Sequence, residues 1–95
     1  MSVIASFRDT ETERLWRSGK SRRLPADLHR RAFKKLAILN AAIELDNLRV
    51  PPGNHLEALG GDRSGRHSIR INDQYRVCFL WRDGNAFDVE IVDYH

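Results

Sequence analysis

The first half of the chain carries hydrophobic residues at the spacing of amphipathic helices. Thr10 and Glu13 have the spacing of a capping box, which predicts a short helix that starts at Thr10 and ends near Gly19. A longer helix is predicted to begin around Pro25, and one more turn is expected over 45–48. The apolar stripe of the longer helix comprises Leu28, Ala32, Leu36, Leu39 and Ile43.

The rest of the chain alternates between hydrophobic and polar residues, which is typical of half-buried strands. A short edge strand is predicted over 3–7, and the main strands are predicted over 68–72, 75–82 and 87–92. The hydrophobic positions expected to share one face are Ile69, Ile71, Tyr75, Val77, Phe79, Trp81, Phe87, Val89 and Ile91.

The segment 83–85, Asp-Gly-Asn, is a hairpin signal. A two-residue turn at Asp-Gly would place Phe79 opposite Asp88 and would mix the two faces of the sheet. A three-residue loop keeps Phe79 opposite Phe87 or Val89, and we therefore predict the longer loop.

Two helices followed by an antiparallel meander predict an α+β fold, with two N-terminal helices packed on one face of a small antiparallel β-sheet. We expect residues 1–95 to form a single domain, because both halves need each other to bury an apolar face. The opposite face then presents a polar wall that contains Arg70 and Arg76. Candidate chemistry is expected on that open face.

The net charge of +3 hides a strong asymmetry along the chain. Residues 1–35 and 63–82 are rich in Lys and Arg, whereas 36–62 and 83–95 are net acidic. Most of the 16 cations are arginines, whose planar guanidinium groups bind phosphate through two parallel hydrogen bonds. The pattern fits a nucleic-acid partner or an acidic protein partner, with a solvated basic surface as the alternative.

The sequence gives no sign of export, a membrane span or a cofactor. Its single cysteine, Cys78, allows no internal disulfide, which fits a reducing cytoplasm. The first residues lack the regions of a signal peptide, and no apolar run approaches the roughly 18 residues of a membrane span. Metal-ligand spacing, a P-loop and a dinucleotide-binding motif are all missing, so we expect a cytoplasmic protein without metal, cofactor or membrane contact.

Two segments carry groups suited to phosphate chemistry. Residues 61–76 read Gly-Asp-Arg-Ser-Gly-Arg-His-Ser-Ile-Arg-Ile-Asn-Asp-Gln-Tyr-Arg, and residues 93–95 read Asp-Tyr-His. Imidazole can donate or accept a proton near neutral pH, and arginine can stabilise a charged phosphorane. Together such groups can cleave RNA without a metal ion, by attack of the ribose 2′-OH on its own phosphate.

This order and spacing closely resemble the HigB branch of the RelE-like toxins of bacterial toxin–antitoxin pairs. The resemblance covers nearly the whole chain and is most specific over 51–95. It implies a RelE-like fold and a ribosome-dependent mRNA endonuclease that a HigA-like helix-turn-helix antitoxin inhibits. The ribosome and mRNA are the other implied partners, and operator DNA would be bound only by the toxin–antitoxin complex.

The resemblance also implies which residues act. The implied catalytic residues are His95, Tyr94, Asp93, Arg76 and Glu57. The implied RNA-binding residues are Arg63, Arg66, His67, Arg70 and Asn72. Arg76 would clamp the phosphate, His95 would act as acid or base, and Asp93 would orient either of them or accept the 2′-OH proton. Structural alternatives are an ion pair between Arg76 and Glu90 across the sheet and a salt bridge of Asp93.

The chain departs from the family pattern at three positions, two of which bear on the chemistry. Many HigB-like toxins read Leu-His-Pro-Leu-Lys-Gly-Asp-Arg where residues 56–63 here read Leu-Glu-Ala-Leu-Gly-Gly-Asp-Arg. The family histidine falls on Glu57, which can act as a base, and the family lysine falls on Gly60, which supplies no cation. The alternative function is a non-catalytic RNA- or ribosome-binding module on the same fold.

The outer face of the second helix carries Arg30, Arg31, Lys34 and Lys35. This face is either solvated or a contact for RNA or antitoxin.

Overall fold

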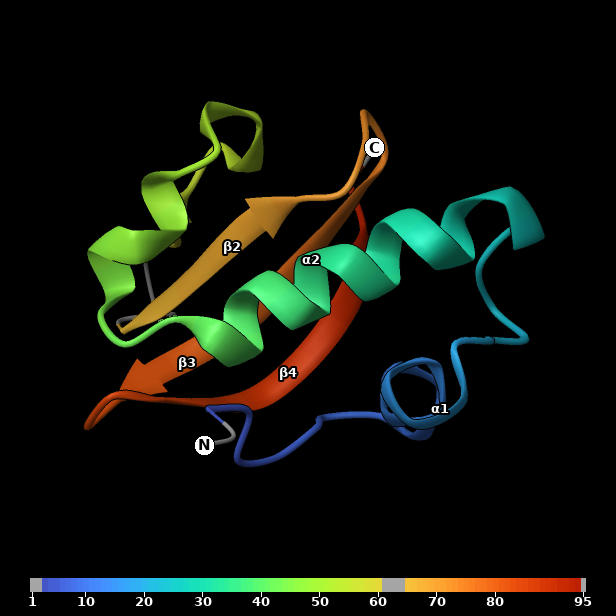
Figure 1. Ribbon diagram of the computed structural model, residues 1–95, viewed down its shortest axis with the longest axis horizontal. Helices are drawn as coiled ribbons and strands as arrows, with labels where there is room; N and C mark the ends of the chain where they lie inside the picture. The colour runs from blue at the N-terminus through green and yellow to red at the C-terminus, as the bar shows by residue number, and fades with distance from the viewer. Residues whose placement is uncertain (1–2, 61–64, 95) are drawn as a thin grey trace.

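The computed structural model describes residues 3–60 and 65–94. Within this part of the chain, two α-helices pack on one face of a four-stranded antiparallel sheet with the order β1-β2-β3-β4 (Figure 1). The elements are α1 (Thr10–Ser18), the 3₁₀ turn η1 (Ala26–Leu28), α2 (His29–Ala41), the 3₁₀ turns η2 (Leu45–Arg49) and η3 (Pro52–Asn54), β1 (Glu57–Ala58), β2 (Arg66–Arg70), β3 (Tyr75–Arg82) and β4 (Asn85–Asp93). The predicted α+β class is confirmed.

Hydrogen bonds cap both ends of α1. Its N-cap is Asp9, whose carboxylate accepts the Thr12 N–H at 2.7 Å, so the prediction of Thr10 as the cap was wrong. A charged acceptor one residue earlier serves the first N–H groups and also complements the helix dipole. Gly19 ends the helix as predicted, with φ of 78° and its N–H bonded to the Leu15 carbonyl.

We expect Asp9→Ala to lower the free energy of unfolding by about 1 kcal/mol, because the capped N–H would lose its partner. Urea denaturation measures the change. Thr10→Ala is the matched control, since Thr10 is exposed and already lies inside the helix, and its stability should be unchanged or slightly higher. A larger loss for Thr10→Ala than for Asp9→Ala would restore Thr10 as the cap.

α2 lies across the sheet and supplies much of the core (Figure 1). Ala32, Leu36 and Leu39 are fully buried, as the apolar stripe predicted. The stripe was wrong at its ends: Leu28 belongs to η1, and Ile43 is 82% exposed. The helix stops at Ala41, so the helical spacing no longer directs Ile43 toward the core. The fully buried sheet residues include Ile69, Val77, Phe79 and Val89.

β3 and β4 are joined by a two-residue turn, not by the three-residue loop that the alternation predicted. Arg82 pairs with Asn85 across the hairpin. The two turn residues, Asp83 and Gly84, have positive φ angles of 53° and 77°. This is the combination that a type I′ turn requires, and its twist matches that of the flanking strands.

A β-bulge in β4 prevents the mixing of faces that the short turn would otherwise cause. β4 advances three residues from Phe87 to Glu90, while its partner β3 covers only two, between Leu80 and Cys78. Asp88, inside this step, has a positive φ of 52°. Val89 therefore stays fully buried, whereas Phe87 lies opposite Leu80 on the other face, contrary to prediction.

Residues 3–7 run parallel to β4 at the edge of the sheet. They form isolated bridges, Ile4 with Ala86 and Phe7 with Val89, rather than the regular edge strand that was predicted. Backbone hydrogen bonds of 2.8 to 3.0 Å accompany these bridges. In the part of the chain described here, no helix has both the length and the apolar character needed to cross a membrane.

Candidate active site

Arg76 lies on the sheet face that the helices leave open, and only 9% of its surface is exposed. Its Nε donates a hydrogen bond to Ser68 Oγ at 2.7 Å. Its Nη2 donates to the His55 carbonyl at 2.5 Å and to the Ser68 carbonyl at 3.3 Å. Among the described residues these bonds use Nε and Nη2, so Nη1 is the nitrogen left for a ligand.

The acceptor at His55 depends on an unusual backbone conformation. His55 follows η3 and adopts a left-handed φ of 44°. The fully buried Asn54 fixes this turn by donating from its amide to the carbonyls of Leu48, at 3.1 Å, and Val50, at 3.3 Å. Left-handed non-glycine residues are uncommon and gather at functional sites. The loop before β1 thus holds a carbonyl oxygen against Arg76.

Glu57 places a carboxylate at the rim of this site. β1 pairs with β2 so that Glu57 lies opposite Ser68, the residue that holds Arg76. The Glu57 Oε2 atom lies 3.9 Å from Arg76 Nη2, and the Glu57 side chain is 60% exposed. Because water screens an exposed carboxylate, this long ion pair compensates the buried guanidinium only weakly.

The turn between β2 and β3 forms one wall of the site. Arg70, the last residue of β2, makes an ion pair with Asp73 in this turn. The Asn72 side-chain oxygen accepts the N–H groups of Gln74, at 2.9 Å, and Tyr75, at 2.7 Å. Asn72 therefore shapes the turn, and Asp73 holds the Arg70 side chain.

Tyr94 completes the open side of the site. Its N–H donates to the Gln74 carbonyl at 2.5 Å, and its side chain remains exposed. A cavity of about 310 Å³ is lined by Glu57, Arg70, Asn72, Asp73, Arg76 and Tyr94. Three predicted catalytic residues and two predicted RNA-binding residues thus meet in one cavity.

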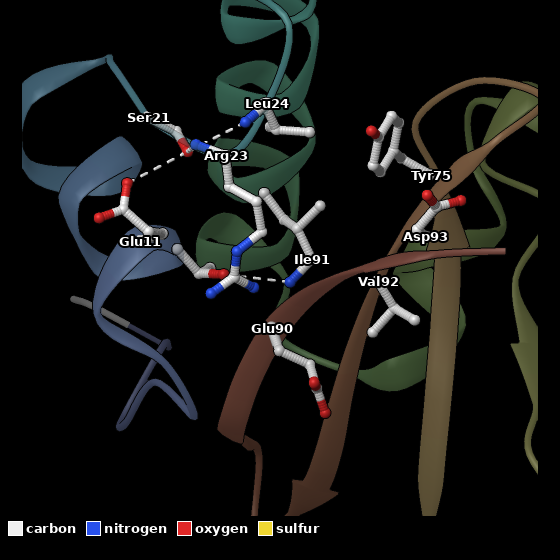
Figure 2. A pocket seen from close by; sticks show the side chains of 10 residues that line it. Glu11, Ser21, Arg23, Leu24, Tyr75, Glu90, Ile91, Val92 and Asp93 are labelled. Carbon is white, nitrogen blue, oxygen red and sulfur yellow. Dashed lines mark hydrogen bonds between the residues drawn. The ribbon is translucent and has the colours of Figure 1, made fainter.

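Asp93 lies on the helix-covered face instead. It pairs with Tyr75 across the hairpin, and its carboxylate accepts a hydrogen bond from the Gln74 amide at 3.1 Å. Figure 2 shows Asp93 beside Tyr75 at one end of a separate cavity of about 300 Å³, which α1 and β4 help to line. The structure therefore does not bring Asp93 to Arg76.

Two predicted RNA-binding residues of β2 do not line the cavity. His67 lies on the helix-covered face and stacks on Phe79, with ring centroids 6.3 Å apart. Arg66 lies on the open face, where its Nη2 atom is 3.1 Å from the Asp88 carboxylate. His67 is thus separated by the sheet from the site, whereas Arg66 shares its face.

The alternative ion pair of Arg76 with Glu90 is not found. Instead, Glu90 pairs with Arg8, whose Nε atom lies 3.6 Å from Glu90 Oε2. His95 and Arg63 lie outside the described residues. Among the described residues, no three His, Cys, Asp or Glu side chains gather as a metal ion would require.

Sequence reasoning missed three parts of the site. Ser68 could have been found, because the predicted alternation already placed it on the same face as Arg76. Asp73 could have been found from its three-residue spacing to Arg70. The His55 carbonyl could not, because a backbone oxygen has no residue-type signature.

Known proteins match this chain over almost its full length. The model of the family described as the RelE-like toxin of type II toxin–antitoxin system HigB matches residues 5–95. Toxin HigB-1 of Vibrio cholerae serotype O1 is 43% identical over 87 residues, which cover 90% of this chain and 92% of that protein. Endoribonuclease HigB of Proteus vulgaris is 29% identical over 93 residues, which cover 98% of this chain and 100% of that protein. The resemblance seen in the sequence is confirmed, and the chain belongs to the HigB-like toxin family of type II toxin–antitoxin systems.

Proposed function

We propose that this chain is a toxin that acts as a ribosome-dependent mRNA endonuclease. The observation that carries the proposal is the buried Arg76 guanidinium in a cavity that Glu57 and Tyr94 also line. The family match and the name of the Proteus vulgaris relative support the same activity.

Arg76 is suited to bind the scissile phosphate because its orientation is fixed and its charge is poorly compensated. Its hydrogen-bond acceptors at Ser68 and His55 are neutral oxygens, and the Glu57 carboxylate is 3.9 Å away. A phosphate oxygen at Nη1 would supply the missing negative charge. The same preorganised donor would stabilise the charge that builds up on the phosphorane.

Cleavage proceeds by attack of the ribose 2′-OH on the adjacent phosphate, without a metal ion. The bond between phosphorus and the 2′ oxygen forms as the bond to the 5′ oxygen breaks, so one group must take a proton and another must give one. Glu57 and His95 are the candidates for these two roles. Tyr94 orients the phosphate or stacks on a base, and Asp93 orients His95.

The remaining basic residues guide the RNA to this cavity. Arg70 lines the cavity wall, and Arg66 extends the positive charge along the same face of β2. Arg63 precedes this strand in the sequence and would continue the path. A cavity of about 310 Å³ holds little of an RNA strand, so the ribosome presents the mRNA in the cleavable conformation.

Membership in a type II toxin–antitoxin family implies an antitoxin partner. We propose that this partner is a HigA-like helix-turn-helix protein, and that operator DNA is bound by the complex and not by the toxin alone. The pair would act in the bacterial cytoplasm, where ribosomes are accessible.

A non-catalytic RNA- or ribosome-binding module is the second candidate function. It is favoured by Gly60, which stands where many family members carry a lysine and supplies no cation. A Cβ atom at Gly60 would meet no atom of the described residues within 4 Å, so their packing does not require glycine there. Steric crowding by these residues therefore does not explain why this position lacks a cation.

We expect induced expression of the wild-type chain to arrest bacterial growth, and coexpression of the antitoxin from the adjacent gene to relieve the arrest. Growth curves with confirmed soluble expression measure both effects. Gly60→Lys provides a third arm, since a Cβ atom at this position meets no described atom within 4 Å. Normal growth with the wild type, together with arrest by Gly60→Lys, would identify the native chain as the binding module.

A further inference from the structure

A second cavity, of about 410 Å³, adjoins the active-site cavity. Its basic wall comes from α2, and its far side comes from the loop after η3. Its chief lining residues are Arg31, Lys35 and His55, and it shares Arg70, Asn72 and Asp73 with the active-site cavity. The ion pair of Arg70 with Asp73 thus forms a partition between the two spaces.

Lys35 is held in place at this cavity. Its Nζ donates to the Asn54 side-chain oxygen at 2.5 Å, and Asn54 is fully buried. Arg31 lies one helical turn earlier and lines the same space. Burial, and then the positive charge of Arg31, lower the pKa of Lys35 below its ordinary value. The two cations are therefore crowded together rather than dispersed in solvent.

Within the described part of the chain, these two cations also have no carboxylate within ion-pair distance. Arg8, Arg14, Arg17, Arg23, Arg49, Arg66, Arg70 and Arg76 each lie within 4.0 Å of a carboxylate. In residues 3–60 and 65–94, no such carboxylate lies near Arg31 or Lys35. Asp73, the carboxylate that lines the cavity, is already paired with Arg70. The cavity therefore fits an anion.

We propose that the Arg31–Lys35 cavity binds a phosphate of the same RNA strand, next to the phosphate held at Arg76. This inference rests on the proposed endonuclease function. The shared wall favours RNA over an acidic protein segment, because a strand with one phosphate at Arg76 that continues past Arg70 enters the second cavity directly. The repeating charge of RNA then brings the next phosphate to Arg31 and Lys35.

Binding of 2′-O-methyl RNA tests the proposal, because such oligonucleotides cannot be cleaved by 2′-OH attack. Fluorescence anisotropy gives the Kd of a dinucleotide and of a hexanucleotide over a range of salt concentrations. We expect the Arg31→Gln, Lys35→Gln double variant to bind the hexanucleotide about tenfold more weakly and to lower the salt slope by about 1. Its affinity for the dinucleotide, which has a single internucleotide phosphate, should stay within about twofold.

The matched control is the Arg30→Gln, Lys34→Gln double variant, which removes two neighbouring cations of α2 that do not line the cavity. At 0.15 M salt, where screening acts over about 8 Å, it should bind the hexanucleotide nearly as the wild type does. Equal losses in the two double variants would show diffuse attraction and overturn the proposal. An unchanged hexanucleotide affinity in the Arg31→Gln, Lys35→Gln variant would also overturn the proposal, even if antitoxin binding weakened.

Two further measurements separate this inference from folding defects and from the proposed function. Arg31→Gln alone keeps the bond between Lys35 and Asn54, and it should weaken hexanucleotide binding about threefold if the phosphate contact is real. If Arg76→Ala stops cleavage while the cavity variant binds normally, the endonuclease proposal stands and this inference fails. If Arg76→Ala cleaves normally, the active-site proposal fails whatever the cavity variant does.

Discussion

Replacing Arg76 with alanine should slow single-turnover mRNA cleavage on programmed ribosomes by about 10²–10³-fold, the typical loss for one preorganised charge donor. The guanidinium is nearly buried and fixed by Ser68 and His55, so its replacement removes a preorganised donor. Ribosome binding, measured by cosedimentation, should weaken far less, because Arg76 offers one contact among many.

A folding defect must be separated from a loss of chemistry in this variant. Arg76→Ala leaves the buried Ser68 hydroxyl without its partner, at a cost of about 1–3 kcal/mol, and frees the carbonyl of the exposed His55. Arg76→Lys restores a charge without the planar fork and should recover stability better than it recovers rate. Equal losses in cleavage and in ribosome binding would reduce Arg76 to a positioning residue.

His95→Gln should abolish toxicity with little change in the melting temperature or in antitoxin binding. The amide can still hydrogen-bond, but it cannot exchange a proton near neutral pH, so a residue acting as acid or base would be inactivated. The readouts are growth on induction, single-turnover cleavage and thermal unfolding of the same preparation.

Asp93→Asn provides the comparison for this histidine. Asp93 lies on the helix-covered face and bonds to Gln74, so we expect a smaller loss of cleavage than for His95→Gln. An equal loss in the two variants would give Asp93 a direct part in the chemistry. A fully toxic His95→Gln protein would assign the proton transfers to Glu57 and its neighbours instead.

The sequence predicted the helices, the main strands and the open polar face, but not the details of the hairpin. Alternation along a strand assumes an unbroken ladder, and the extra residue at Asp88 breaks it. A polar residue in a bulge has the same appearance in a sequence as a polar residue on the solvent face. The alternation therefore argues against the short turn at 83–84, although the sequence carries its Asp-Gly signal.

Only part of the candidate site was predicted, again because irregular backbone has no pattern in the sequence. The family resemblance and strand periodicity identified Arg76, Glu57 and Tyr94, which the structure brings into one cavity. The burial of Arg76 could not be predicted, because the loop that covers it has no periodic pattern. Its key contact is the backbone of His55, which depends on a left-handed conformation that is uncommon for residues other than glycine.

The irregular pairing of residues 3–7 with β4 bears on how the toxin can be recognised. Many partner proteins bind by adding a strand to an exposed sheet edge, and the same exposed edges promote aggregation. Here the outer side of β4 is already occupied along part of its length, and the opposite edge is formed by β1, which spans only Glu57–Ala58. An antitoxin is therefore expected to recognise side chains rather than to extend the sheet, so its affinity should respond to surface substitutions on the toxin.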